Sequence, residues 1–93
     1  MKENSILVYD FVKQHDGEQF TAQDIADGVG LGVRSVNGIV TSSFQRHKNT
    51  EGQSEPLMER IPAEIELADG THKPVKFIRL TDAGRAFDPR VAQ

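Results

Sequence analysis

The sequence predicts an α+β fold in which three helices are followed by a β-hairpin and a short C-terminal helix. Three features predict it. An apolar segment comes first, two short amphipathic segments then flank a glycine-rich turn, and two extended segments flank Asp69-Gly70. Two short helices joined by a tight turn have the layout of a helix-turn-helix, whose second helix can enter the major groove of DNA. With the hairpin as a wing, the order of elements is typical of a winged helix-turn-helix.

Length and composition indicate a single small domain, residues 1–93. Of the 93 residues, 37% are hydrophobic and 27% are charged, which is ordinary for a globular domain. No apolar run approaches the roughly 18 residues that span a membrane, and the N-terminus lacks the apolar core of a signal peptide. The absence of cysteine excludes disulfides, thiolate metal sites and cysteine nucleophiles, and it is consistent with a cytoplasmic protein.

The net charge of −3 argues against simple DNA binding, because phosphate contacts normally draw on a basic surface. The charge is unevenly distributed along the chain, however. Arg34, Arg46 and Lys48 lie in a stretch without any acidic residue between Asp27 and Glu51. The sequence therefore allows a local basic face on an acidic protein.

The first helix is expected to begin at a capping residue, Asn4 or Ser5, and to end near His15, before the turn signal Asp16-Gly17. Its closely spaced apolar residues predict a buried stripe. Phe20 follows in a short extended segment and is expected to point into the core.

The helix-turn-helix is predicted over residues 21–46. Thr21 and Asp24 have the spacing of a capping box at the start of the second helix. Gly30 is expected to end that helix in the left-handed conformation. Gly32 is expected to be the N-cap of the third helix.

The third helix is predicted over residues 33–46, where Val33, Val36, Val40 and Phe44 form one apolar stripe. The opposite face is polar and nearly free of acid, and it carries Arg34, Ser35, Gly38, Thr41, Ser42 and Gln45, with Asn37 at its edge. A glycine inside a helix costs about 1 kcal/mol relative to alanine. Gly38 therefore calls for a reason, either close approach of a partner or close packing between helices, and the sequence leaves both open.

Residues 47–56 form a polar loop that is expected to be mobile. The wing hairpin is predicted over residues 57–80, with Asp69-Gly70 as a two-residue turn. Such a turn places Leu67 opposite His72 and Ile61 opposite Ile78. Pro62 and Pro74 each remove a ladder donor, which predicts that the hairpin is irregular or edge-like in its middle.

A short C-terminal helix, residues 81–88, is expected to follow the wing. Thr81 is the predicted N-cap, and Asp88-Pro89 is expected to stop the helix. Residues 90–93 are expected to form a tail.

Several short motifs follow one another in a fixed order along this chain. They are Ile25-Ala26, Gly30-Leu31, Arg34-Ser35-Val36, Leu57-x-x-Arg60 and, above all, Leu80-Thr81-Asp82-Ala83-Gly84-Arg85-Ala86. In this order and spacing, the chain resembles the bacterial and phage winged helix-turn-helix family of MarR-like style from about Ser5 to Phe87. It departs from that pattern at Gly32 and Ser43, in its acidic hairpin, and in lacking the long terminal helices through which full MarR proteins dimerise.

The resemblance implies a transcription regulator that binds double-stranded DNA without a cofactor. It implies that the third helix approaches the bases with Arg34, Ser35, Asn37, Gly38 and Thr41. It implies phosphate contacts from Thr21, Gln23, Arg46, Lys73 and Lys76. An arginine such as Arg34 can donate two hydrogen bonds to guanine, and Asn37 can pair with adenine. A homodimer would read a palindromic site with half-sites about one helical turn apart.

A different class of function also fits the sequence. A winged helix can be a protein–protein interaction module that does not touch DNA, and the net charge and acidic hairpin favour that alternative. An enzyme is not expected, because no catalytic constellation is present. His15, His47 and His72 are too scattered for a metal site, and the glycines of residues 28–32 do not match the dinucleotide-binding fingerprint.

Overall fold

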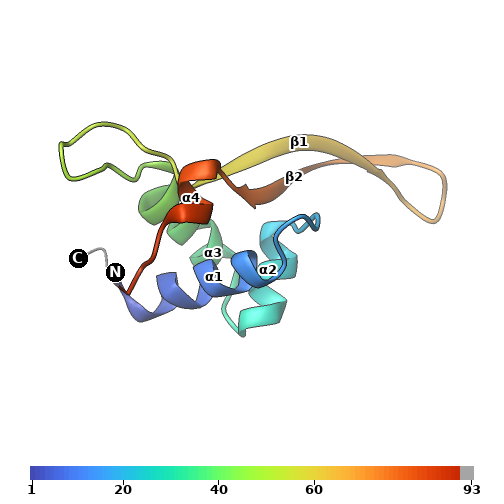
Figure 1. The fold of residues 1–93 in the computed structure, drawn as a ribbon. Coiled ribbons are helices and arrows are strands. Elements are labelled where there is room, and N and C mark those ends of the chain that lie inside the picture. The colour runs from blue at the N-terminus through green and yellow to red at the C-terminus, as the bar shows by residue number, and fades with distance from the viewer. Residues whose placement is uncertain (91–93) are drawn as a thin grey trace.

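Three helices, a two-stranded hairpin and a short final helix follow one another along the chain (Figure 1). The structure is a computed structural model that describes residues 1–90, so residues 91–93 of the predicted tail lie outside it. The elements are α1 (Glu3–Gln14), α2 (Ala22–Val29), α3 (Val33–Ile39), the π-helix η1 (Val40–Gln45), β1 (Met58–Glu66), β2 (His72–Leu80) and α4 (Asp82–Ala86). The predicted α+β class and order of elements are confirmed, an arrangement compatible with a winged helix. No helix in the described range is long and apolar enough to cross a membrane.

The core lies where the helices meet the base of the hairpin. Its buried residues come from every layer: Val8, Tyr9, Val12, Ile25, Ala26, Val36, Val40, Phe44, Leu57, Met58, Ile78 and Leu80. The prediction that Val33 belongs to the buried stripe is wrong, because this side chain is 37% exposed. Val33 is the first residue of α3, and the end of the helix leaves part of its side chain open to solvent.

Local capping follows the sequence at α2 and differs at α1. The Thr21 hydroxyl accepts a hydrogen bond from the Asp24 amide at 3.2 Å, and the Asp24 carboxylate accepts one from the Thr21 amide at 3.0 Å. Gly30 ends α2 with φ of 76°, as predicted. Helix α1 begins at Glu3, so its N-cap is Lys2 and not the predicted Asn4 or Ser5, and Lys2 makes no capping bond with its side chain. The side chain of Ser5 is buried, and its hydroxyl bonds the Ser43 hydroxyl of η1 at 3.2 Å.

The third helix is not the continuous α-helix that the sequence predicts. After Ile39 it widens into the π-helix η1, and the Arg46 amide donates to the Thr41 carbonyl five residues earlier at 3.1 Å. Val36, Val40 and Phe44 are spaced four residues apart, a spacing that drifts around the axis of an α-helix. A π turn holds more residues, and so it keeps Phe44 on the side of the core.

Strands β1 and β2 pair antiparallel, with Ile61 opposite Phe77 and Glu66 opposite His72. The predicted register is therefore wrong by one residue. The connection has three residues, 68–70, because the Leu67 amide donates to the Thr71 carbonyl at 2.7 Å, and Gly70 ends the loop with φ of 87°.

Of the two alternatives for the middle of the hairpin, irregular pairing is wrong, because the ladder is continuous through Pro62 and Pro74, and the edge-like alternative is confirmed, because each strand of the two-stranded sheet is an edge strand. A two-stranded sheet tolerates them since each strand has one free edge. Phe20 is extended as predicted, and its carbonyl accepts a bond from the Ile78 amide at 2.8 Å. This bridge ties the segment before α2 to the outer edge of β2.

The loop of residues 47–56 is folded into a tight turn. Lys48 and Ser54 form an isolated bridge, and the Asn49 carboxamide oxygen accepts bonds from the amides of Glu51 and Gln53. Its predicted mobility stays a prediction.

The short helix α4 fastens the end of the hairpin to α1. The Thr81 hydroxyl caps α4 by accepting from the Gly84 amide at 3.0 Å and donates to the Pro56 carbonyl at 2.6 Å. Gly84 lies so close to β1 that an added Cβ would be 1.9 Å from the Leu57 carbonyl oxygen. Residues 80–86 thus join the end of β2 to the segment before β1 and to α1.

The Tyr9 hydroxyl joins α1 to α4, because it donates to the Gly84 carbonyl at 2.6 Å and also contacts the Phe87 carbonyl. We expect Tyr9→Phe to lower the free energy of unfolding by about 1–2 kcal/mol, since the Gly84 carbonyl loses the shorter of its two hydrogen bonds while the ring stays packed. Urea denaturation of both proteins measures this difference. Equal stabilities would contradict the role assigned to the hydroxyl.

Candidate nucleic-acid interface

The five residues proposed to approach bases lie together on α3 and the start of η1. Arg34, Ser35, Asn37 and Gly38 are exposed, and Thr41 is half-buried. Because Val36 and Val40 are fully buried on the other side, the helix is fixed in rotation with this polar face turned outward. The face contains no acidic side chain.

Arg60 of β1 joins this face to the hairpin. Its guanidinium donates to the Asn37 side-chain oxygen at 3.0 Å, the Asn37 carbonyl at 3.3 Å, the Thr41 hydroxyl at 3.2 Å and the Gln45 side-chain oxygen at 3.0 Å. All of these acceptors are neutral. The arginine therefore braces the helix against the hairpin while its positive charge remains uncompensated.

Partial burial at this junction lowers the pKa of Arg60 from its ordinary value, but an arginine stays protonated in proteins. The sequence marks Arg60 only as part of a family motif and does not assign it to the site. One feature could have pointed to Arg60 as a site residue. It has no acidic neighbour on the facing strand, because the residue opposite it is Ile78. The contact also occupies acceptor atoms of Asn37 and Thr41, two residues proposed to read bases.

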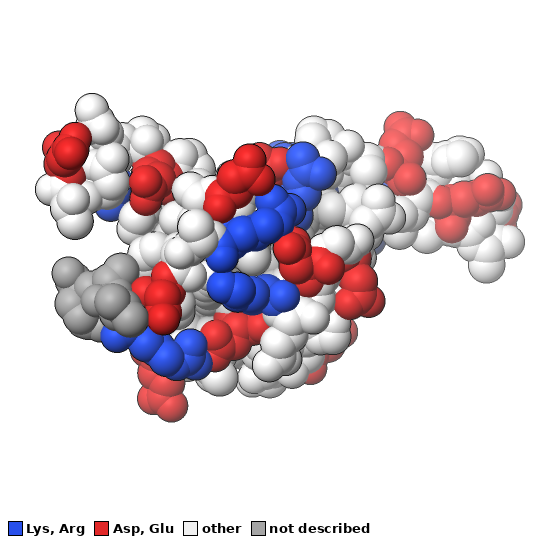
Figure 2. Space-filling view, viewed as in Figure 1, with Lys and Arg blue, Asp and Glu red and all other residues white. Residues whose placement is uncertain are grey.

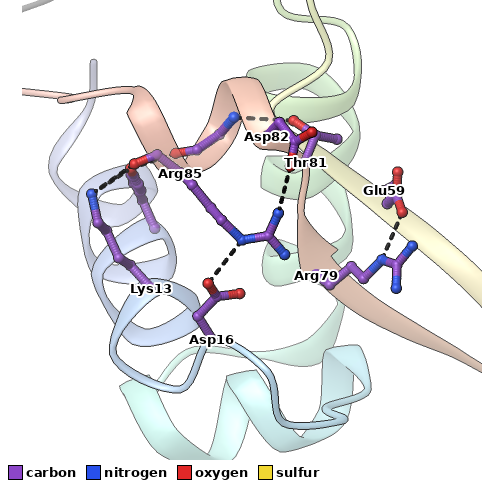
Figure 3. Close-up of polar contacts among 9 residues, drawn as sticks. Lys13, Asp16, Glu59, Arg79, Thr81, Asp82 and Arg85 are labelled. Carbon is purple, nitrogen blue, oxygen red and sulfur yellow. Dashed lines mark hydrogen bonds and ion pairs between the residues drawn. The ribbon is translucent and has the colours of Figure 1, made fainter.

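Ion pairs divide the cationic side chains into two groups. Arg79 pairs with Glu59 at 2.6 Å, Arg85 with Asp16 at 2.8 Å and Asp82 at 3.0 Å, and Arg90 with Asp10 at 2.6 Å. Figure 3 shows the Arg85 guanidinium between its two carboxylates. Hydrogen bonds and charge attraction from Asp16 raise the pKa of Arg85, and those from Asp10 raise the pKa of Arg90.

These pairs lie on α1, α4 and the base of the hairpin, where Figure 2 shows Lys and Arg interspersed with Asp and Glu. The candidate interface is different. Among residues 1–90, no ion pair involves Arg34, Arg46, Arg60, Lys73 or Lys76. Positive charge that is free to meet a phosphate is therefore available around α3 in spite of the net charge of −3.

The two hairpin lysines proposed as phosphate contacts lie on opposite faces. Side chains alternate along a strand, so Lys76, opposite Pro62, shares a face with Arg60 and looks toward the α3 side. Lys73, opposite Ile65, shares the other face. The structure thus groups Lys76 with the candidate interface and separates Lys73 from it.

The remaining proposed phosphate contacts have local roles. Thr21 caps α2, and the Gln23 side chain donates to the Asp27 carboxylate at 2.9 Å. Arg46 directly follows η1 and is exposed.

Toward its tip the hairpin becomes acidic. Glu64 and Glu66 lie on the same face as Lys76 and are exposed, and Figure 2 shows acidic side chains over the distal hairpin. The cationic region therefore ends near Lys76.

The structure excludes one of the two reasons that the sequence leaves open for Gly38, namely close packing between helices of residues 1–90. A Cβ added at Gly38 would meet nothing within 4 Å, apart from its own helix and its chain neighbours. Close packing with another helix of the described residues 1–90 is thus ruled out as the reason for this glycine. By contrast, a Cβ at Gly28 would meet the Phe11 ring at 2.3 Å.

Comparisons of the chain with protein-family models, with curated proteins and with solved structures find no match.

Proposed function

We propose that this protein binds double-stranded DNA sequence-specifically, as a small winged helix-turn-helix regulator of MarR-like style in a bacterium or phage. The observation that carries the proposal is the exposed, acid-free face of α3, where Arg34 has no ion pair and Arg60 adds a charge with only neutral partners. Such a regulator would act in the cytoplasm, where its DNA lies.

In this proposal α3 enters the major groove with its first turn toward the bases. Arg34 is the base-reading residue, because its guanidinium is exposed and can bond both acceptors of a guanine. Ser35 and Gly38 are small and let the helix come close. Asn37 uses its amide donors, since its oxygen accepts from Arg60.

The hairpin contributes at its base and not at its tip. Arg60 and Lys76 lie on the side of α3 and supply charge for flanking phosphates. Glu64 and Glu66 repel the backbone and keep the tip away from it. Thr21 and Gln23, at the N-terminus of α2, and Arg46, after η1, supply further phosphate contacts.

The glycine at position 38 gives a prediction in which stability and binding change in opposite directions. We expect Gly38→Ala to raise the free energy of unfolding by up to about 1 kcal/mol, because alanine favours the helix and its methyl group meets open space. We expect the same change to weaken duplex binding, because the methyl group holds the helix away from the base edges. Thermal unfolding and fluorescence anisotropy measure the two effects, and unchanged binding would contradict the close approach.

Selection from a pool of random duplex DNA, at low and at physiological salt, tests the proposal. Enrichment of one motif that survives physiological salt is the expected result. Retention without enrichment would contradict sequence-specific reading, and no retention at low salt would contradict DNA binding altogether.

The alternative of a protein-interaction module is supported by one specific observation. The distal hairpin exposes large apolar side chains, with Ile65 37% and Leu67 42% exposed. Failure to retain DNA, together with capture of a protein through the hairpin, would favour this alternative.

A further inference from the structure

The hairpin has one polar face and one apolar face. The polar face packs on the helices at its base and carries Arg60, Lys76, Glu64 and Glu66 farther out. The opposite face is formed by the pairs Ile61–Phe77, Ala63–Val75 and Ile65–Lys73, with Leu67 at the tip. We call this second set the apolar wing face.

The apolar wing face loses its cover toward the tip, since Ile61, Ala63, Val75 and Phe77 are partly buried whereas Ile65 and Leu67 are exposed. Figure 1 shows the distal half of the hairpin projecting beyond the helices. Ile65 and Leu67 are among the most exposed large apolar side chains of the described residues. A two-stranded hairpin is marginally stable unless an apolar face is packed against something, so a projecting hairpin of this kind indicates an interaction surface.

We propose that a second copy of this chain covers the apolar wing face, with the two hairpins stacked face to face and antiparallel. A twofold axis across the Ala63–Val75 pair makes the contact self-complementary. It places Val75 against the partner's Val75 and Ile65 against the partner's Ile61. It also places Lys73 over the partner's Phe77, where a cation can lie on the ring.

In this arrangement the tip of one hairpin lies over the base of the partner's hairpin, and the base has a hollow and an acidic residue that suit it. A hollow of about 200 Å³ lies there between Ile61 and Phe77 of the apolar wing face and the segment of residues 16–19. The arginines of its lining, Arg79 and Arg85, are paired with carboxylates.

Glu18, also in that lining, is exposed, and within residues 1–90 its side chain bonds only the His15 ring. Lys73 is the charged residue at the tip end of the apolar wing face, and among residues 1–90 it forms no ion pair. The antiparallel arrangement brings Lys73 toward the partner's Glu18, because the segment of residues 16–20 runs along the β2 edge.

This dimer leaves the candidate DNA interface free, because Arg60 and Lys76 lie on the other face of the hairpin. The inference does not depend on DNA binding. The symmetric apolar contact runs from Ile61 to Ile65, about 13 Å along the strand, which is small for a protein interface, and we expect a dimer that dissociates at micromolar concentration.

Sedimentation equilibrium over a range of protein concentrations tests the dimer, and a cross-link tests its geometry. The chain has no cysteine, so a single introduced thiol reports one position. With a short bifunctional thiol reagent, Val75→Cys is expected to form covalent dimers efficiently, because the two thiols meet at the axis. Lys76→Cys is the matched control, one residue along the same strand on the opposite face, and is expected to remain largely monomeric.

Exchanging the charges of Lys73 and Glu18 tests the contact at the end of the interface and leaves its apolar centre unchanged. We expect Lys73→Glu and Glu18→Lys each to weaken the dimer about tenfold and the double variant to recover most of that loss. A monomer up to several hundred micromolar, equal cross-linking at the two positions, or no recovery in the double variant would overturn the inference.

Discussion

Replacing Gly84 with alanine is expected to lower the free energy of unfolding by about 3 kcal/mol or more, the largest stability effect of any single methyl group in this protein. The new Cβ would lie 1.9 Å from the Leu57 carbonyl oxygen, and a backbone atom cannot move aside as a flexible side chain can. Helix α4 would have to separate from the hairpin base and lose the Thr81 and Tyr9 hydrogen bonds. A small domain has only about 5–15 kcal/mol of stability, so the loss is severe.

Gly38→Ala is the matched control, because the same chemical change meets nothing within 4 Å there. Urea unfolding of the two variants and of the unchanged protein measures both effects. A Gly84 variant as stable as the Gly38 variant would contradict the close contact between α4 and β1.

Replacing Arg34 with alanine is expected to weaken binding to the selected duplex about ten- to hundredfold, the effect of losing one bidentate contact to guanine. Binding to random duplex is expected to change little. The reason is that Arg34 is exposed on α3 and, within residues 1–90, bonds no other side chain and forms no ion pair.

Lys76→Ala is the contrasting variant, because a phosphate contact carries no sequence information. It is expected to weaken specific and random duplex alike and to reduce the salt slope by about one. Anisotropy titrations at several salt concentrations distinguish the two. Equal loss on both duplexes for Arg34→Ala would contradict its base-reading role.

Features set by neighbours in the sequence could be predicted. The capping box of Thr21 and Asp24, the left-handed Gly30 and the Thr81 cap all depend on residues within one helical turn, and the structure confirms them. The burial of Val36 and Val40 could also be predicted, since residues four apart lie on one face of an α-helix.

Features set by distant contacts could not be predicted. The π-helix arises because Phe44 must stay on the core side, which the local sequence does not express. The hairpin register depends on whether Gly70 ends a two-residue or a three-residue loop. Both kinds of loop use a glycine with a positive φ at this position, so the sequence does not distinguish them. Arg60 finds its partners 15 to 23 residues away in the sequence, so its position in the candidate site was visible only in the fold.

The candidate site was predicted as residues of the third helix together with phosphate contacts around the second helix and on the hairpin, and the structure shows which of them share a face. It groups Lys76 and Arg60 with α3 and separates Lys73, because a strand sends alternate side chains to opposite faces. A list of residues taken from sequence motifs does not say which hairpin residues lie on the same face.

The most direct test of the candidate DNA interface is an NMR titration of the isotope-labelled protein with a short duplex at low salt. The account predicts that amide shifts change in α3, η1 and the region of β2 around Lys76, while α1 and α4 change little. Unchanged spectra, or changes centred on the ion-paired face of α1 and α4, would contradict it.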